Sequence, residues 1–332
     1  RRPFTGEHVV STEAVTADEI LEPAPETPAG TGARAVWRRL RHEPTALIGL
    51  AVVALLVLVA LAAPLLAAAE GQDYTSYHDH LLDSARGGVP SGRLGGISGT
   101  HWLGVEPKTG RDMFARVVYG ARVSLAIALS ATVLQLLIGM LVGLTAGLGG
   151  RIADAVLSRF TDLVLAFPSL IFSIALLGIV PQSFPRPVLL VMVLATFGWA
   201  GTARITRGQA LSLKTRDYVA AARLAGGRSA RLARREILPG LAAPVITYAA
   251  LMVPGNIVAE AGLSFLGVGI NPPTPSWGQM LSSATTWFAG DPMYVLIPGV
   301  LLFVTVLSFT LFGDGLRNAL DPRSTSLSRK AA

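Results

Sequence analysis

The sequence predicts an all-α fold, a polytopic transmembrane helix bundle with six transmembrane helices. Hydrophobic residues make up 51% of the 332 residues and charged residues only 15%, against about 25% in an ordinary soluble domain. A bilayer core about 30 Å thick is crossed by roughly 20 apolar residues in a helix. Long segments without a charged residue occupy 44–69, 123–150, 163–185, 187–203, 237–259, 261–290 and 292–313.

The chain before the first apolar segment is expected to be a disordered, basic tail over 1–44. Acidic residues and prolines without apolar periodicity fill its first part, which is typical of disorder. Four arginines directly precede the apolar segment: Arg34, Arg38, Arg39 and Arg41. The first transmembrane helix is predicted at 45–69, and 70–119 is predicted to form an external loop.

The other five helices lie within a core predicted over 120–314. The segment 261–290 is not counted as a span, because 271–279 reads Asn-Pro-Pro-Thr-Pro-Ser-Trp-Gly-Gln and is rich in helix breakers. Residues 315–332 are expected to form a C-terminal tail. The five helices are predicted at 120–148, 154–180, 187–210, 239–267 and 293–314.

The distribution of basic residues predicts the orientation. Residues 204–235 contain nine Lys and Arg and one acidic residue, whereas 237–316 contain no Lys or Arg. Short cytoplasmic loops are enriched in these residues, so the loop over 211–238 and both termini are predicted to be cytoplasmic. Topology thus accounts for the net charge of +7, and no nucleic-acid partner is expected.

The sequence offers no catalytic or metal site, so we expect a protein that is not an enzyme. The chain has no cysteine, and none of its three lysines stands in a Gly-Lys-Ser/Thr phosphate-binding loop. His78 and His80 have no third ligand at a suitable spacing. No cofactor or metal is therefore expected on this chain.

One short segment of the basic loop is expected to be a helix that needs a partner. It runs from Asp217 to an end at Gly226, with Asp217 predicted to cap the first amides and Gly226 to take the left-handed conformation. About nine residues form a helix roughly 13 Å long, too short to be stable alone in water. Its small Ala221 and Ala222 would let it lie close in a groove of another protein.

This segment resembles the signature of the membrane permease subunits of ATP-binding-cassette (ABC) importers, which is Glu-Ala-Ala, three residues, Gly, nine residues, Ile-x-Leu-Pro. Ala220 replaces the glutamate and Glu236 replaces the isoleucine. The residues that match, at the family's spacing, are Ala221, Ala222, Gly226, Leu238 and Pro239.

Further motifs resemble one branch, the C-type subunit of dipeptide, oligopeptide and nickel permeases. They run in order along most of the chain: 40–49, 101–104, 110–112, 119–125, 166–168, 217–218, 259–267, 272–278, 313–317 and 320–322.

The resemblance implies a type I ABC importer permease architecture in a bacterial inner membrane. It implies a homologous second permease subunit, two cytoplasmic ABC ATPase domains that bind ATP and Mg, an extracytoplasmic substrate-binding protein and membrane lipid as partners. The cargo would be di- or oligopeptides, with nickel as the alternative. The residues implied in ATPase docking are Asp217, Tyr218, Ala221, Ala222, Gly226, Leu238 and Pro239.

Glu260 is the one acidic residue inside a long apolar helix, where a charge is costly unless it faces protein or water. It could contact cargo in the pathway or make a structural hydrogen bond, and we favour the structural role. Pro254 and Gly255 could bend the same helix at a gate or simply allow close packing. A proton-coupled secondary transporter that uses Glu260 is the alternative function.

Overall fold

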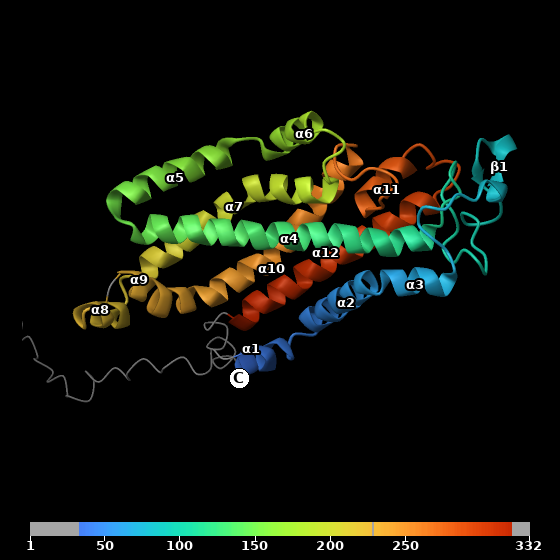
Figure 1. The fold of residues 1–332 in the computed structure, drawn as a ribbon. Helices are drawn as coiled ribbons and strands as arrows, with labels where there is room; N and C mark the ends of the chain where they lie inside the picture. Colours follow the sequence, from blue (N-terminus) through green and yellow to red (C-terminus); the bar gives the residue numbers. More distant parts are fainter. Residues whose placement is uncertain (1–32, 228, 321–332) are drawn as a thin grey trace, which may run out of the picture.

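The computed structural model of the chain describes residues 33–227 and 229–320. Within them the fold is an elongated bundle of long helices packed side by side, with small elements gathered at two ends (Figure 1). This confirms the predicted all-α fold. The long helices are α2 (Pro44–Leu61), α4 (Met113–Leu148), α5 (Gly150–Ala166), α7 (Arg186–Leu213), α10 (Leu238–Phe265) and α12 (Met293–Leu320).

In the described residues, five helical segments are long and apolar enough to cross a bilayer: α2, α4, α7, α10 with the turn before it, and α12. A sixth crossing requires α5 and α6 (Ser169–Ile179), which meet at an angle of 79°. One continuous helix over 154–180 was therefore a wrong prediction. Pro168 lacks an N–H, and Phe167 before it is extended at φ −75° and ψ 135°, so the chain turns there.

Several predicted boundaries also differ from the structure. The helix predicted over 45–69 is interrupted at Ala62 and continues as α3 (Ala63–Glu70). Helix α4 begins at Met113, before the predicted start at 120, because the Asp112 carboxylate accepts a hydrogen bond from the Ala115 N–H at 2.7 Å.

The predicted tails are partly helical. Helix α1 (Ala33–Leu40) lies within the predicted N-terminal tail and is held by Leu40, which is buried against Ala46 and Ala319. Helix α12 reaches Leu320, beyond the predicted end at 314. The rest of both predicted tails, 1–32 and 321–332, lies outside the described residues.

Small residues let α4 and α7 pack closely. Gly139, Gly143 and Gly147 repeat every fourth residue along α4, so they share one face. A Cβ atom on Gly143 would lie 2.5 Å from the backbone oxygen of Ala203 on α7. A side chain at this position would therefore force the two helices apart.

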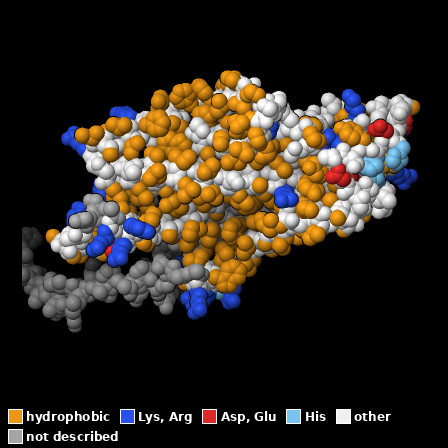
Figure 2. Space-filling model, in the orientation of Figure 1, with side chains coloured by type: hydrophobic (Ala, Val, Ile, Leu, Met, Phe, Trp, Pro, Cys, Tyr) orange, Lys and Arg blue, Asp and Glu red, His pale blue; other side chains and the backbone are white. Residues whose placement is uncertain are grey.

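Apolar side chains from the long helices form the core. Leu125 of α4, Ile257 of α10 and Phe309 of α12 are buried in one cluster with Trp277. A second cluster joins α4, α6, α7 and α10. Figure 2 shows hydrophobic side chains over the body of the bundle, with charged and histidine side chains mainly toward its ends.

The two ends differ in structure. The cap end holds the residues between α3 and α4, and the loop with α11 (Trp277–Ala284) (Figure 1). Its small elements are η1 (Asp79–Leu81), β1 (Leu82–Asp83), η2 (Ser84–Arg86) and β2 (Val89–Pro90), with β1 and β2 antiparallel and Leu82 opposite Pro90. The α8 end holds α8 (Asp217–Leu224), α9 (Ser229–Leu232) and the π-helical turn η3 (Ala233–Ile237).

Candidate functional site

The short helix expected between α7 and α10 is present as α8. The residue at its N-cap position is Arg216, whose side chain makes no capping hydrogen bond, and Asp217 is the first helical residue. The prediction that Asp217 caps the helix is therefore wrong by one position. An acidic residue in the first turn still interacts favourably with the positive end of the helix dipole.

Glycine ends α8 as expected. Gly226 has φ +83°, in the left-handed region, and an added Cβ would meet no atom within 4 Å. The Gly227 N–H donates to the Ala222 carbonyl at 3.0 Å, which satisfies one of the last carbonyl groups of the helix.

One face of α8 is anchored to the bundle. Val219 is fully buried in a cluster with Leu232, Ile237 and Leu241, so it contacts the start of α10. Tyr218 lies beside the same region, because its hydroxyl is 3.8 Å from the position of a Cβ on Gly240. The structure thus places α8 beside Ile237, Gly240 and Leu241, the residues that flank Leu238 and Pro239.

The other face of α8 is exposed and partly apolar. Leu224 is 89% exposed, and even Tyr218, on the anchored side, is 47% exposed. Ala221 is exposed and Ala222 half-buried. Leu224 was not among the predicted site residues, because a single leucine in an alanine-rich helix does not show by itself which way it points.

Glu260 is fully buried in α10 and sits in a group of serines. Its Oε1 accepts a hydrogen bond from the Ser264 hydroxyl at 2.8 Å, and Ser124 and Ser276 also lie within reach of the carboxyl. Ser264 in turn accepts from the Ile270 N–H at 3.1 Å. Glu260 therefore links α10 to α4 and to the loop that leads into α11.

A polar pair that sequence reasoning missed lies one turn away in α10. Asn256 donates to the Gln135 amide oxygen of α4 at 2.8 Å and to the Thr132 hydroxyl at 2.8 Å. Gln135 donates back to Asn256 at 3.0 Å and to the Leu194 carbonyl of α7 at 2.8 Å. Both amides are buried, so the pair connects three spans.

This pair borders a cavity of about 200 Å³ beside the bend between α5 and α6. Ser169 and Ser173 of α6, and Ala259 and Leu263 of α10, also line it. Pro254, buried inside α10, and Gly255, exposed on it, are not lining residues of this cavity.

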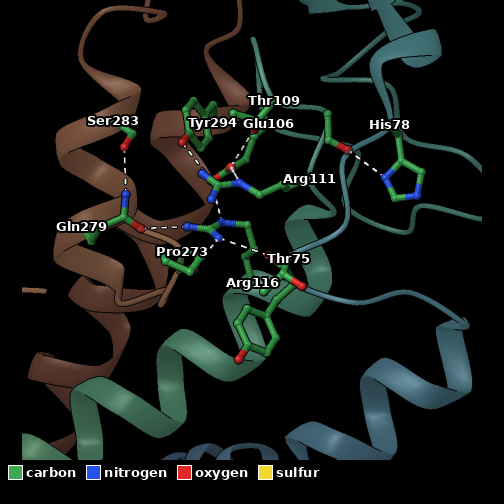
Figure 3. Close-up of polar contacts among 12 residues, drawn as sticks. Thr75, His78, Glu106, Thr109, Arg111, Arg116, Pro273, Gln279, Ser283 and Tyr294 are labelled. Carbon is green, nitrogen blue, oxygen red and sulfur yellow. Dashed lines mark hydrogen bonds and ion pairs between the residues drawn. The ribbon is translucent and has the colours of Figure 1, made fainter. Parts of the chain in front are cut away.

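A second polar group lies at the cap end, centred on Glu106 (Figure 3). Its Oε2 accepts from Arg111 Nε at 2.8 Å, and its Oε1 accepts from the Tyr294 hydroxyl at 2.9 Å. Arg116 Nε is 2.6 Å from Oε1. These contacts connect Glu106 of the cap to Arg116 of α4 and to Tyr294 of α12.

Arg116 extends this group to the loop before α11. Its guanidinium donates to the Gln279 side-chain oxygen at 2.8 Å and to the Pro273 carbonyl at 3.1 Å (Figure 3). It also donates to the Tyr74 carbonyl at 3.2 Å. One buried side chain therefore holds three segments that lie far apart in the sequence.

Two protein families match the sequence. Residues 135–326 match the family described as binding-protein-dependent transport system inner membrane component. Residues 33–82 match the N-terminal TM domain of oligopeptide transport permease C.

Curated relatives match over most of their length. The dipeptide transport system permease protein DppC of Alkalihalophilus pseudofirmus is 35% identical, with 93% of this chain and 98% of the relative covered. The oligopeptide transport system permease protein OppC of Bacillus subtilis is 34% identical, with 86% and 88% covered.

A solved structure supports the fold. It is an inward-facing conformation of the MetNI methionine ABC transporter, with a TM-score of 0.51 and 19% identity. The match covers 63% of this chain and 98% of that chain. The chain therefore belongs to the binding-protein-dependent inner-membrane permeases of ABC importers, in the C-type branch of the peptide permeases.

Proposed function

We propose that this chain forms half of the translocation pathway of an ATP-driven importer of di- or oligopeptides in a bacterial inner membrane. The names of the curated relatives support peptides as cargo. A homologous permease subunit would supply the other half of the pathway, and an extracytoplasmic binding protein would deliver the cargo. Two ATPase subunits would bind ATP and Mg and carry out hydrolysis.

The observation that carries this proposal is that α8 is buried on one face and exposed on the other. Val219 packs one face of α8 against the start of α10. Leu224, on the other face, is almost fully exposed to solvent. An exposed leucine at the tip of a short helix is suited to a hydrophobic groove on a partner. A movement of α8 would be transmitted to α10 through the packing of Val219. Helix α10 would carry it to Asn256, which pairs with Gln135.

We place the α8 end and both termini in the cytoplasm. Lys and Arg are concentrated over 204–235 and absent over 237–316, and this distribution supports the orientation. The cap end would then face the binding protein.

The cavity beside the bend between α5 and α6 is our candidate for a pathway surface. It offers serine hydroxyls and amide groups at membrane depth, where a polar peptide backbone needs hydrogen-bond partners. Ala259 and Leu263 line it, but Glu260 points to Ser264, so we assign Glu260 a structural role. Pro254 and Gly255 remain candidates for a gate in α10.

The experiment is uptake of a labelled dipeptide into proteoliposomes that contain the assembled importer. We expect uptake to require ATP and the binding protein and to persist when an ionophore removes the proton gradient. Leu224→Asp should abolish most uptake, because a charge replaces the exposed apolar contact, whereas Ser212→Asp at the exposed end of α7 should not. Uptake that needs the proton gradient and not ATP would contradict the proposal.

Glu260→Gln separates the importer from the proton-coupled alternative. The glutamine keeps the size and a hydrogen-bond acceptor but cannot titrate, so a proton-coupled carrier would lose concentrative uptake. We expect the variant importer to retain ATP-dependent uptake, with any loss appearing in stability. Loss of uptake in a fully assembled complex with normal ATP hydrolysis would show that Glu260 acts in the pathway.

A further inference from the structure

An apolar groove with one cation at its end runs between α4 and the start of α7. Its volume is about 570 Å³. Ile127 and Leu134 of α4 and Val188 and Met192 of α7 form its walls, and Tyr119 and Arg122 lie at its end nearest the cap. The groove follows α4 for about 18 Å from Arg122 to Leu134, at about 1.5 Å per residue.

Arg122 is the one charged residue that lines this groove. Its side chain is exposed, and it makes no hydrogen bond or ion pair with the part of the chain that the structure describes. Arg116, six residues earlier in α4, is by contrast fully buried against Glu106. The charge of Arg122 is therefore available to an external anion.

The level of Arg122 in the membrane follows from the charges at the other end of α4. Val142 and Gly143 of α4 border the same pocket as Asp162 of α5 and Arg204 of α7, which form an exposed ion pair at 2.7 Å. From Arg122 to this level α4 rises about 30 Å, the thickness of the hydrocarbon core. Arg122 thus lies at the head-group level of the leaflet at the cap end.

We propose that this groove binds one anionic phospholipid from the leaflet at the cap end. The phosphate would pair with the Arg122 guanidinium, with Tyr119 beside it at the head-group level. One acyl chain would lie along Ile127 and Leu134. The groove spans about half of the bilayer core, which matches a single leaflet.

Three properties of the groove favour a lipid: the positive charge of Arg122, the position of Arg122 at the head-group level, and a length that fits one leaflet. A water-soluble anion would need no apolar groove, and a zwitterionic head group would leave the Arg122 charge only partly compensated. The site is separate from α8 and from the cavity next to Gln135, so it does not depend on the proposed cargo.

The test is native mass spectrometry of the assembled importer with phosphatidylglycerol and phosphatidylethanolamine of equal chain length. We expect one phosphatidylglycerol to be retained with a preference of about tenfold or more, as for a charge-assisted contact. Arg122→Gln should remove the preference, and Arg122→Lys should keep most of it. Arg93→Gln, an exposed cation of the cap outside the groove, is the matched control.

Two further changes test the groove itself. Ala126→Trp should fill it and weaken the retention of both lipids, while the complex assembles normally because Ala126 is exposed. Ser130→Cys should react with a lipid-soluble maleimide in the assembled complex. Equal retention of both lipids by the wild type, an unchanged preference in Arg122→Gln, or protection of Ser130→Cys by the second permease subunit would each overturn the proposal.

Discussion

Arg116 of α4 and Glu106 of the cap form a buried ion pair, with Nε and Oε1 2.6 Å apart and both side chains at most 1% exposed. The pair is not isolated, because Arg111, Tyr294 and Gln279 share its oxygens and N–H groups. A buried charge without such partners would be strongly unfavourable. The cap is therefore fixed to the bundle by polar contacts as well as by apolar packing.

Glu106→Gln should destabilise the protein by about 3–5 kcal/mol, because it leaves the Arg116 charge buried without its counter-ion. The measurement is the free energy of unfolding in detergent. Arg86→Gln is the control: its ion pair with Asp83 is mostly exposed, so the expected change is at most about 1 kcal/mol. Equal effects of the two substitutions would show that Glu106 does not hold the cap.

Gly143→Ala should separate α4 from α7. The added Cβ would lie 2.5 Å from the Ala203 backbone oxygen, which cannot rotate away. We expect a loss of about 1–3 kcal/mol, the usual cost of overpacking, seen as a lower thermal midpoint and less assembled complex. Gly178→Ala in α6, where an added Cβ meets no atom within 4 Å, should be tolerated.

Glu70, at the end of α3 beyond the first span, should make the stability of the cap depend on pH. Burial, helped by the neighbouring Asp112 carboxylate, raises the pKa of Glu70 from 4.5 to about 7. The folded chain then holds this proton more tightly than the unfolded chain. Its contribution to stability is present below pH 4.5 and is lost as pH rises through about 7.

The check is the thermal midpoint of the wild type and of Glu70→Gln across this range. The wild type should lose stability toward neutral pH by more than the variant, because glutamine cannot titrate. Asp79→Asn, at an exposed carboxyl of the cap, should leave the wild-type slope in place. A slope that survives in Glu70→Gln would assign the effect to another group.

The orientation can be tested with single cysteines, because the chain has none of its own. Ser91→Cys, at an exposed position of the cap, should react with an impermeant thiol reagent added outside intact cells. Thr215→Cys, exposed at the α8 end, should react only after the membrane is opened. The reverse pattern would invert the proposed topology.

The features that the sequence predicts well are local. The end of α8 at Gly226 depends on one glycine and its neighbours, and the apolar lengths of α7 and α10 depend on uncharged runs. The bend at Pro168 was missed although the proline is visible, because transmembrane helices also tolerate proline without such a bend. Two prolines inside α10, Pro244 and Pro254, leave that helix continuous.

The features that could not be predicted depend on partners far apart in the chain. Arg116 and Gln279 are separated by 163 positions, and Gln135 and Asn256 by 121. Polar residues inside apolar runs were the available signal, but without the fold nothing pairs them. The predicted start of α4 at 120 was also too late. Arg116 is charged and suggests a loop, but in the structure it lies inside α4 and pairs with the buried Glu106.

If α8 docks on an ATPase subunit, a thiol placed at its exposed tip should lie within cross-linking distance of that subunit. Leu224→Cys in the otherwise cysteine-free chain, carried in the assembled complex, should form a cross-link to the ATPase subunit with a short reagent that has one thiol-reactive and one photoreactive group. Ser91→Cys at the cap end should not. Absence of an ATPase cross-link from Leu224→Cys in a complex that hydrolyses ATP and imports peptide would show that α8 does not dock on the ATPase.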